Sequence, residues 1–265
     1  MSRCVTLVVI AAAFLLPRAV PAAPLTSIEE IRACMRGNLP KQTSRQEVKL
    51  TARDRAGGER ELEAQMHWKR FPRGLPRVHI RVEAPIDMRG SAYLLIEEEQ
   101  GRESAMYVYL PTVQRVRRIT ARTMSDQLWG TDFSYDDIRQ LQWISEEAAP
   151  ERLPDQEVAG RNVYVLSLKH GPEENSSYER IVAFVDHDTC VSLKLEFYER
   201  GDQPRKVLRA DPASLFKEGR RWIARDAEMS DLRDETSTRI HIVKVENDVE
   251  IRDRVFNPTM LDRGH

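Results

Sequence analysis

Apolar and polar residues alternate along much of the chain with a period of two. In residues 62–68, 78–82 and 191–197, every second position is apolar and the positions between are polar. A β-strand places successive side chains on opposite faces, so each run predicts a strand with one apolar and one wet face. Such strands are typical of an antiparallel sheet with one side on a core or cavity.

Two further runs with this period, residues 92–96 and 106–110, are followed by a candidate turn. Pro111 ends the second run, because proline has no N–H to donate to the next bond of a strand ladder. Residues 129–133 then read Trp-Gly-Thr-Asp-Phe, which favours an ordered turn held by an aromatic side chain at each end. The pattern predicts a strand pair that leads into a well-defined loop.

Helical signals are few and short. Ser27 and Glu30 have the spacing of a capping box, which predicts a helix ending near Gly37. A second helix is expected over residues 134–142, where a serine can act as the N-cap, and a shorter one over residues 212–216. With the strand pattern, these elements predict a mainly β fold with a few α-helices.

Residues 1–22 have the features of a secretory signal. Arg3 precedes the apolar run Val5–Leu16, and small residues ending at Ala22 supply a cleavage site. The apolar run is too short to span a bilayer as a helix. We therefore expect cleavage near Ala22 and export of residues 23–265. That part has no Pro-, Gly- or Ser-rich linker and no tandem repeat, which favours a single domain.

The charge balance argues against nucleic acid as a partner. The sequence has 41 basic and 42 acidic residues; the signal holds two arginines and no acid, so 41 less 2 leaves 39 basic against 42 acidic residues, a net charge of −3. Such a chain does not attract nucleic acid as a whole molecule. Apolar residues make up 41% of the sequence, which is enough for a core.

Cys34 and Cys190 are the cysteines that remain after the signal. An exported protein with one such pair could hold one disulfide, and closure would constrain a long loop. The sequence does not show that the two residues meet, so a bridge and two buried thiols remain equally open.

The sequence contains no recognised catalytic or metal-binding motif: HExxH, GxSxG, CxxC and P-loop patterns are all absent. Asp186, His187, Asp188 and Cys190 could be drawn as metal ligands, but we favour an ordinary hairpin turn, because further convergent ligands are missing. We therefore predict no catalytic residue, no metal site and no cofactor, and we do not expect an enzyme.

Other polar residues also have simple structural interpretations. The adjacent Asp136 and Asp137 are expected to cap or solvate a short helix rather than to act as an acid–base pair. His67, His79 and His241 fall on faces opposite apolar residues, which predicts solvated strand positions.

The strongest positive run is formed by Arg115, Arg117 and Arg118, with Arg122 beyond them. It fits a solvated strand edge, where charge prevents pairing with other chains. It equally fits a contact with anionic lipid head groups at a membrane surface.

The apolar faces could line a cavity for an acyl chain, because a curved sheet that does not fill itself with side chains can hold a ligand. A filled core has the same pattern and is the better interpretation of periodicity alone. The candidate lining residues are Leu62, Met66, Trp68, Val78, Ile80, Leu94, Ile96, Val108, Leu110, Leu193, Leu195 and Phe197, with Trp129, Phe133 and Trp143 at the mouth.

Three motifs resemble the LolA-like outer-membrane lipoprotein-sorting family: PIDMRGSAYL (85–94), YLPTVQRVRRI (109–119) and GTDFSYDDI (130–138). The resemblance is nearest to the branch associated with RND-type (MMPL-like) inner-membrane transporters. It weakens before Lys41 and over residues 146–160, and the chain again resembles the family up to residue 261. It implies a strongly curved antiparallel sheet forming an incomplete β-barrel with a helical lid, and it favours the cavity over the filled core.

The resemblance implies a periplasmic carrier that shields acyl chains of a lipid or lipoprotein and moves them between the inner and outer membranes, touching membranes transiently. An inner-membrane RND transporter would be its partner. The alternative is a non-enzymatic periplasmic interaction or sensor module that partners such a transporter without cargo. Neither function needs a catalytic group.

Overall fold

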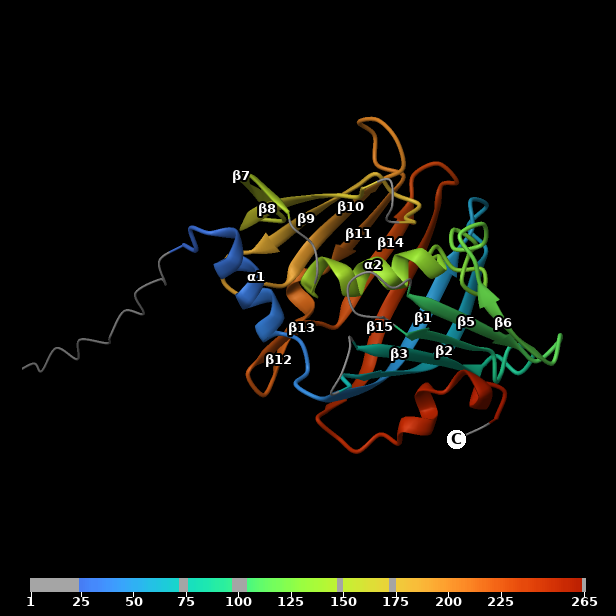
Figure 1. The fold of residues 1–265 in the computed structure, drawn as a ribbon. Coiled ribbons are helices and arrows are strands. Elements are labelled where there is room, and N and C mark those ends of the chain that lie inside the picture. Colours follow the sequence, from blue (N-terminus) through green and yellow to red (C-terminus); the bar gives the residue numbers. More distant parts are fainter. Residues whose placement is uncertain (1–23, 72–75, 97–103, 147–149, 172–174, 264–265) are drawn as a thin grey trace, which may run out of the picture.

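A curved antiparallel sheet dominates the computed structural model (Figure 1). The structure describes residues 24–71, 76–96, 104–146, 150–171 and 175–263, and it describes no side chain over residues 142–146. The proposed signal, residues 1–22, lies outside the described part. In that part, no helix combines the length and the apolar character needed to span a membrane.

Within these residues the main sheet has 13 strands in the order β6-β5-β4-β3-β2-β1-β15-β14-β11-β10-β9-β8-β7. Its strands are β1 (Thr43–Arg53), β2 (Glu59–Lys69), β3 (Arg77–Ala84), β4 (Ala92–Ile96), β5 (Ala105–Leu110), β6 (Arg115–Ile119), β7 (Glu151–Val158), β8 (Arg161–Lys169), β9 (Arg180–Asp186), β10 (Ser192–Tyr198), β11 (Lys206–Ala210), β14 (Asp226–Asp231) and β15 (Thr236–Asn247). A separate hairpin pairs β12 (Leu215–Glu218) with β13 (Arg221–Ala224). The sheet is not closed into a barrel, so β6 and β7 are its edges. The predicted mainly β, incomplete-barrel fold is confirmed.

Two α-helices lie on the inner, concave face of this sheet: α1 (Ile28–Gly37) and α2 (Tyr135–Glu146). The predicted capping box of α1 is present, because Ser27 accepts from the Glu30 backbone and the Glu30 side chain accepts from the Ser27 backbone. Short 3₁₀ helices follow at η1 (Pro212–Ser214), η2 (Asp253–Phe256) and η3 (Pro258–Met260). The expected helix near residues 212–216 is thus only one turn long, and the chain continues as a strand.

Apolar side chains on the inner face form two clusters. The first inner cluster lies on β1–β6, and the second inner cluster lies on β8–β10 and β14 beneath α1. Ile138 of α2 and Ile240 of β15 contact both clusters. The helix α2 therefore joins the two halves of the sheet on their inner side.

The outer face of the first half is covered by the C-terminal segment, residues 251–261. Phe256 and Leu261 of this segment are fully buried and pack with Ala92, Leu94 and Ile96 of β4. Because the inner face of β4 is also covered, all five residues of this strand are buried. Unlike the runs in which apolar and polar residues alternate, β4 therefore has no wet face.

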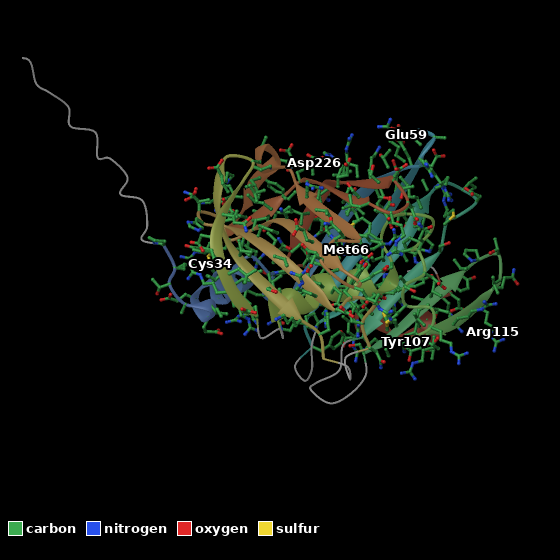
Figure 2. The ribbon with its side chains drawn as sticks, turned by 90° about the horizontal axis from the view of Figure 1, so that it is seen from above. Cys34, Glu59, Met66, Tyr107, Arg115 and Asp226 are labelled. Atoms are coloured by element: carbon green, nitrogen blue, oxygen red, sulfur yellow. A yellow bond between two sulfur atoms is a disulfide. The ribbon has the colours of Figure 1, made fainter. Side chains whose placement is uncertain are left out.

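A disulfide joins Cys34 of α1 to Cys190, which follows the turn between β9 and β10. Figure 2 marks Cys34. The two residues are 156 positions apart in sequence, and their Cα atoms lie 5.8 Å apart. The bridge therefore fixes the N-terminal helix against the second half of the sheet. Of the two alternatives that the sequence left open, a disulfide and two buried thiols, the structure has the disulfide.

Candidate functional site

The inner face of the first half of the sheet is covered by a loop and the start of α2. We call residues 120–146 the cover. Trp129 is 8% exposed and packs in the first inner cluster, and Phe133 is 1% exposed and packs in the second. Trp129 and Gly130 both have positive φ, which produces the sharp turn between these aromatic side chains. The ordered turn with two aromatic anchors is present.

The first turn of α2 is held by a buried polar network centred on Asp137. Its carboxylate accepts hydrogen bonds from the Ser134 backbone N–H at 2.7 Å, from Tyr178 Oη at 2.5 Å and from Lys206 Nζ at 2.7 Å. The Asp137 N–H in turn donates to Ser134 Oγ at 3.1 Å. Burial, and after it the charge of Asp137, raises the pKa of Tyr178 well above its usual value. The tyrosine therefore remains a hydrogen-bond donor.

Asp136 is equally buried but faces different partners. It accepts hydrogen bonds from Arg139 at 2.7 Å, from Gln140 at 3.0 Å and from the Ser177 backbone N–H at 2.7 Å. Asp137 caps the helix, as one of the two expected roles requires, but neither aspartate is solvated, because both are fully buried. Three of their partners, Ser177, Tyr178 and Lys206, lie about 40 to 70 positions away in sequence, where local patterns give no sign of them.

The loop that precedes α2 is fixed to the middle of the sheet. Asp132 accepts hydrogen bonds from the hydroxyls of Thr236 and Thr238 on β15, and the Asp132 N–H donates to Thr238 Oγ1 at 2.8 Å. Lys206 Nζ also donates to the Asp132 carbonyl oxygen at 2.8 Å. The motif Gly130–Ile138 thus anchors the cover near its centre.

The structure brings most of the predicted cavity residues to the inner face. These residues lie in or against the first inner cluster: Leu62, Met66, Trp68, Val78, Ile80, Val108, Leu110 and Trp129. Phe133, Leu195 and Phe197 belong to the second inner cluster, which meets the first beneath Ile138. The prediction that they bind an acyl chain remains a prediction.

Three predicted cavity residues lie elsewhere. Leu94 and Ile96 face outward beneath the C-terminal segment, and the inner positions of β4 are Tyr93 and Leu95. Leu193 packs on the outer face of the second half. An irregularity in the β9–β10 register between residues 192 and 194 puts Leu193 on the opposite face from Leu195. The side chain of Trp143 lies outside the described residues.

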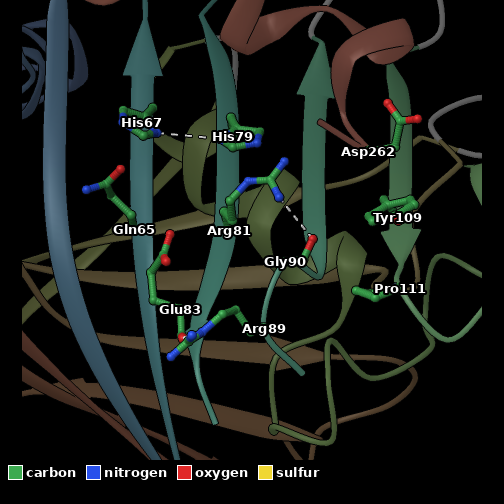
Figure 3. A pocket seen from close by; sticks show the side chains of 10 residues that line it. All are labelled: Gln65, His67, His79, Arg81, Glu83, Arg89, Gly90, Tyr109, Pro111 and Asp262. Atoms are coloured by element: carbon green, nitrogen blue, oxygen red, sulfur yellow. Dashed lines mark hydrogen bonds between the residues drawn. The ribbon is translucent and has the colours of Figure 1, made fainter. Parts of the chain in front are cut away.

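A polar pocket of about 440 Å³ opens on the outer face beside the C-terminal segment (Figure 3). Its floor includes His67 and His79, which are paired across β2 and β3 with their Nδ1 atoms 3.5 Å apart. Both are buried, so their expected solvated positions are wrong. The C-terminal segment explains the burial, because it crosses β3, where Arg77 and Arg81 donate to the carbonyl oxygens of residues 256 and 261. His241 is half-buried beside Asp226.

A second pocket, of about 510 Å³, lies between the β1–β2 and β14–β15 turns. No residue that lines either of these two pockets belongs to the inner clusters. Met124, Leu128 and Trp129 of the cover pack directly in the first inner cluster.

The remaining candidate groups have structural partners. Asp186 forms an ion pair with Arg161 at 2.7 Å, and Cys190 is in the disulfide. Among the side chains that the structure describes, no three His, Cys, Asp or Glu residues come together as metal ligands would. Arg115, Arg117 and Arg118 lie on β6 and are exposed.

Solved structures place this arrangement in a known class of fold. A structure described as an outer membrane lipoprotein-sorting protein domain from Vibrio parahaemolyticus has a TM-score of 0.79 and 22% identity, over 88% of this chain and 97% of that one. A DUF1329 family protein from Desulfovibrio piger has a TM-score of 0.80 and 23% identity, over 88% and 96%. A LolA superfamily protein from Nitrosomonas europaea has a TM-score of 0.70 and 17% identity, over 88% and 98%. The protein therefore has a LolA-like fold.

The model of a family described as an uncharacterized protein matches residues 75–263, which is more than half of the chain. The chain belongs to this family. No curated protein matches it. The resemblance drawn from the three sequence motifs is confirmed for the fold, and the RND-associated branch stays a prediction.

Proposed function

We propose that the protein is a periplasmic carrier that binds acyl chains of a lipid or lipoprotein and moves them between the inner and outer membranes. One observation carries the proposal: two apolar clusters on the inner face of an open sheet meet under a single helix and its loop. The descriptions of two structural neighbours, as lipoprotein-sorting and LolA superfamily proteins, support the same class of function.

The energetics suit a site that is packed when empty. Each CH₂ group removed from water contributes about 0.8 kcal/mol, so an acyl chain is strongly driven into an apolar site. A carrier must also release its cargo. If the cargo displaces the cover from the inner face, apolar side chains of the cover return to water, and this cost offsets part of the gain. The net affinity then stays low enough for exchange.

The polar network indicates which part of the cover moves. Asp132 and Asp137 hold its centre to β11 and β15 through Lys206 and two threonines. Met124 and Leu128 contribute apolar contacts to the first inner cluster, and backbone hydrogen bonds also join residues 124–128 to residues 133–136. We infer that cargo entry breaks these backbone bonds and withdraws residues 120–129 from β1–β6, while the first turn of α2 stays fixed.

Transport of this kind needs no bond to be made or broken, so no catalytic group is required. An inner-membrane transporter of the RND type would load or receive the cargo, and the proposed signal at residues 1–22 would direct the protein to the periplasm.

Native mass spectrometry of protein purified from the periplasm without detergent, followed by lipid extraction, tests the proposal. A defined bound lipid, or uptake of a fluorescent fatty acid by the delipidated protein, is the expected result. A ligand-free mass together with no uptake of fatty acid or phospholipid would contradict the carrier function.

The packed inner face also favours a second candidate, an interaction or sensor module that partners an inner-membrane RND transporter without carrying lipid. A stable complex with such a transporter, formed by protein that takes up no lipid, would support this alternative.

A further inference from the structure

The first edge of the open sheet carries exposed positive charge. Arg115, Arg117 and Arg118 on β6 are exposed, and Arg122 follows in the first turn of the cover. Over the described residues, none of these four arginines forms an ion pair or a side-chain hydrogen bond. Figure 2 shows Arg115 at the margin of the molecule. The charge is therefore available to a partner outside the chain.

These arginines point to both sides of the edge. Arg117 is paired with Val108, whose side chain faces the inner cluster, and Arg118 is paired with Tyr107, which packs on the outer side. Successive side chains of a strand alternate between faces, so the edge itself is positive rather than one face of the sheet. A broad anionic surface can meet such an edge from several directions.

Exposed apolar side chains lie beside this charge. Ile86, in the β3–β4 turn, is 75% exposed, and Val113, in the β5–β6 turn, is 41% exposed. The two turns lie together, because a Cβ atom on Gly90 would be 3.7 Å from the ring of Pro111. The nearby Asp87 carboxylate lies 3.9 Å from Arg60, which offsets its charge.

We propose that this basic edge, with Ile86 and Val113, docks the protein on an anionic phospholipid surface. The proposal deepens the carrier function and rests on it, since a membrane is the source or destination of the cargo. Arginines attract anionic lipid head groups, and an exposed apolar side chain gains by leaving water at the interface. An acidic protein partner could also contact the arginines and Ile86, but arginines on both sides of the edge fit a broad lipid surface better than a single protein face.

Docking at this edge brings the membrane next to the cover. The strand β6 ends at Ile119, which packs in the first inner cluster, and the chain then enters the cover at residue 120. The segment that we expect to withdraw therefore begins at the docked strand.

Co-sedimentation with phosphatidylcholine vesicles, with and without phosphatidylglycerol, tests the proposal on the full mature chain. We expect binding that requires phosphatidylglycerol. Replacing Arg115, Arg117 and Arg118 together with glutamine should weaken it on the order of 100-fold. The matched control replaces Arg200, Arg209 and Arg220, which are also exposed, and should bind like the wild type.

A second pair of variants tests the apolar contribution. Ile86→Ser should weaken binding, whereas Leu232→Ser should not, because Leu232 is 49% exposed but lies in the β14–β15 turn, away from the basic edge. The proposal is overturned if the wild type ignores phosphatidylglycerol, if both arginine variants bind alike, or if the edge variant binds like the wild type.

Fatty acid uptake measured without vesicles separates this proposal from the carrier function. The edge variant should take up a fluorescent fatty acid as the wild type does. If vesicle binding does not depend on the edge arginines, and the wild type takes up fatty acid normally, only the docking site is refuted. If vesicle binding depends on the edge arginines, but the wild type takes up no fatty acid, only the carrier function is refuted.

Discussion

Lys206 Nζ lies 2.7 Å from the Asp137 carboxylate and 2.8 Å from the Asp132 carbonyl oxygen, in a site that is almost closed to water. One lysine on β11 thus holds both the loop of the cover and the first turn of α2. A buried charge is tolerated only when it is paired and hydrogen-bonded, and this pair meets both conditions.

Removing one partner of this pair should be costly. Lys206→Met leaves the Asp137 charge buried without its cation, and we expect a loss of about 3–5 kcal/mol in the free energy of unfolding. The double variant Asp137→Asn with Lys206→Met should lose less than the sum of the single variants. Urea denaturation of all four proteins gives the coupling energy, and additive losses would argue against the pair.

A hydroxyl on the inner face should weaken cargo binding. Val108→Thr places one in the first inner cluster with little change in volume, and we expect about tenfold weaker uptake of a fluorescent fatty acid. Val165→Thr makes the same change on the outer face, where Val165 is also buried, and should leave the uptake unchanged. Thermal unfolding checks that both variants are folded. Equal effects on uptake would exclude the inner face as the site.

The disulfide should contribute measurably to stability. Because it closes a loop of 156 residues between Cys34 and Cys190, reduction should lower the free energy of unfolding by about 2–4 kcal/mol. Urea denaturation with and without a reducing agent measures the loss. The double variant Cys34→Ser with Cys190→Ser should match the reduced protein and show no response to the agent.

The capping box of α1 predicts a pH dependence. Hydrogen bonds from the Ser27 and Thr26 backbone lower the pKa of Glu30 from 4.5 to about 2. A carboxylate with a lowered pKa stabilises the folded state above its unfolded value of 4.5, and this contribution is lost as the pH falls toward 2. The stability advantage of the wild type over Glu30→Gln should therefore shrink across this range. Urea denaturation of both proteins at neutral pH and between pH 4.5 and 2 measures this difference in the free energy of unfolding. A difference that does not change with pH would contradict the lowered pKa of Glu30.

The sequence pattern located the sheet well but assigned some faces incorrectly. Alternation identified β2, β3, β5 and β10 as strands, and in β5 and β10 burial alternates for most of the strand. In β2 and β3 the polar positions His67 and His79 are buried as well. It failed on β4, whose outer side is covered by a segment more than 150 residues later in the chain. It also failed at Leu193, because one irregular residue reverses the alternation and local sequence does not reveal it.

Most of the polar network around Asp137 could not be predicted from neighbouring residues, because its partners come from distant parts of the sequence. Ser134 and Asp137 are three residues apart, so their reciprocal capping was within reach of a local pattern. Tyr178 and Lys206 reach Asp137 only because the sheet brings β9–β11 under α2. The buried state of this carboxylate is a property of the tertiary fold, and adjacent acidic residues in the sequence suggested the opposite.

The pairing of β1 with β15 has a consequence for folding. These strands lie side by side at the centre of the sheet, with Ser44 opposite Asn247, although they come from opposite ends of the described chain. The strands on either side of them connect mainly to their neighbours in sequence, and contacts between distant residues form late because closing a long loop costs entropy. We therefore expect the β1–β15 pairing to form last. The folding chain would hold two separate meanders until β15 pairs with β1, so completion of the native sheet waits for this late strand.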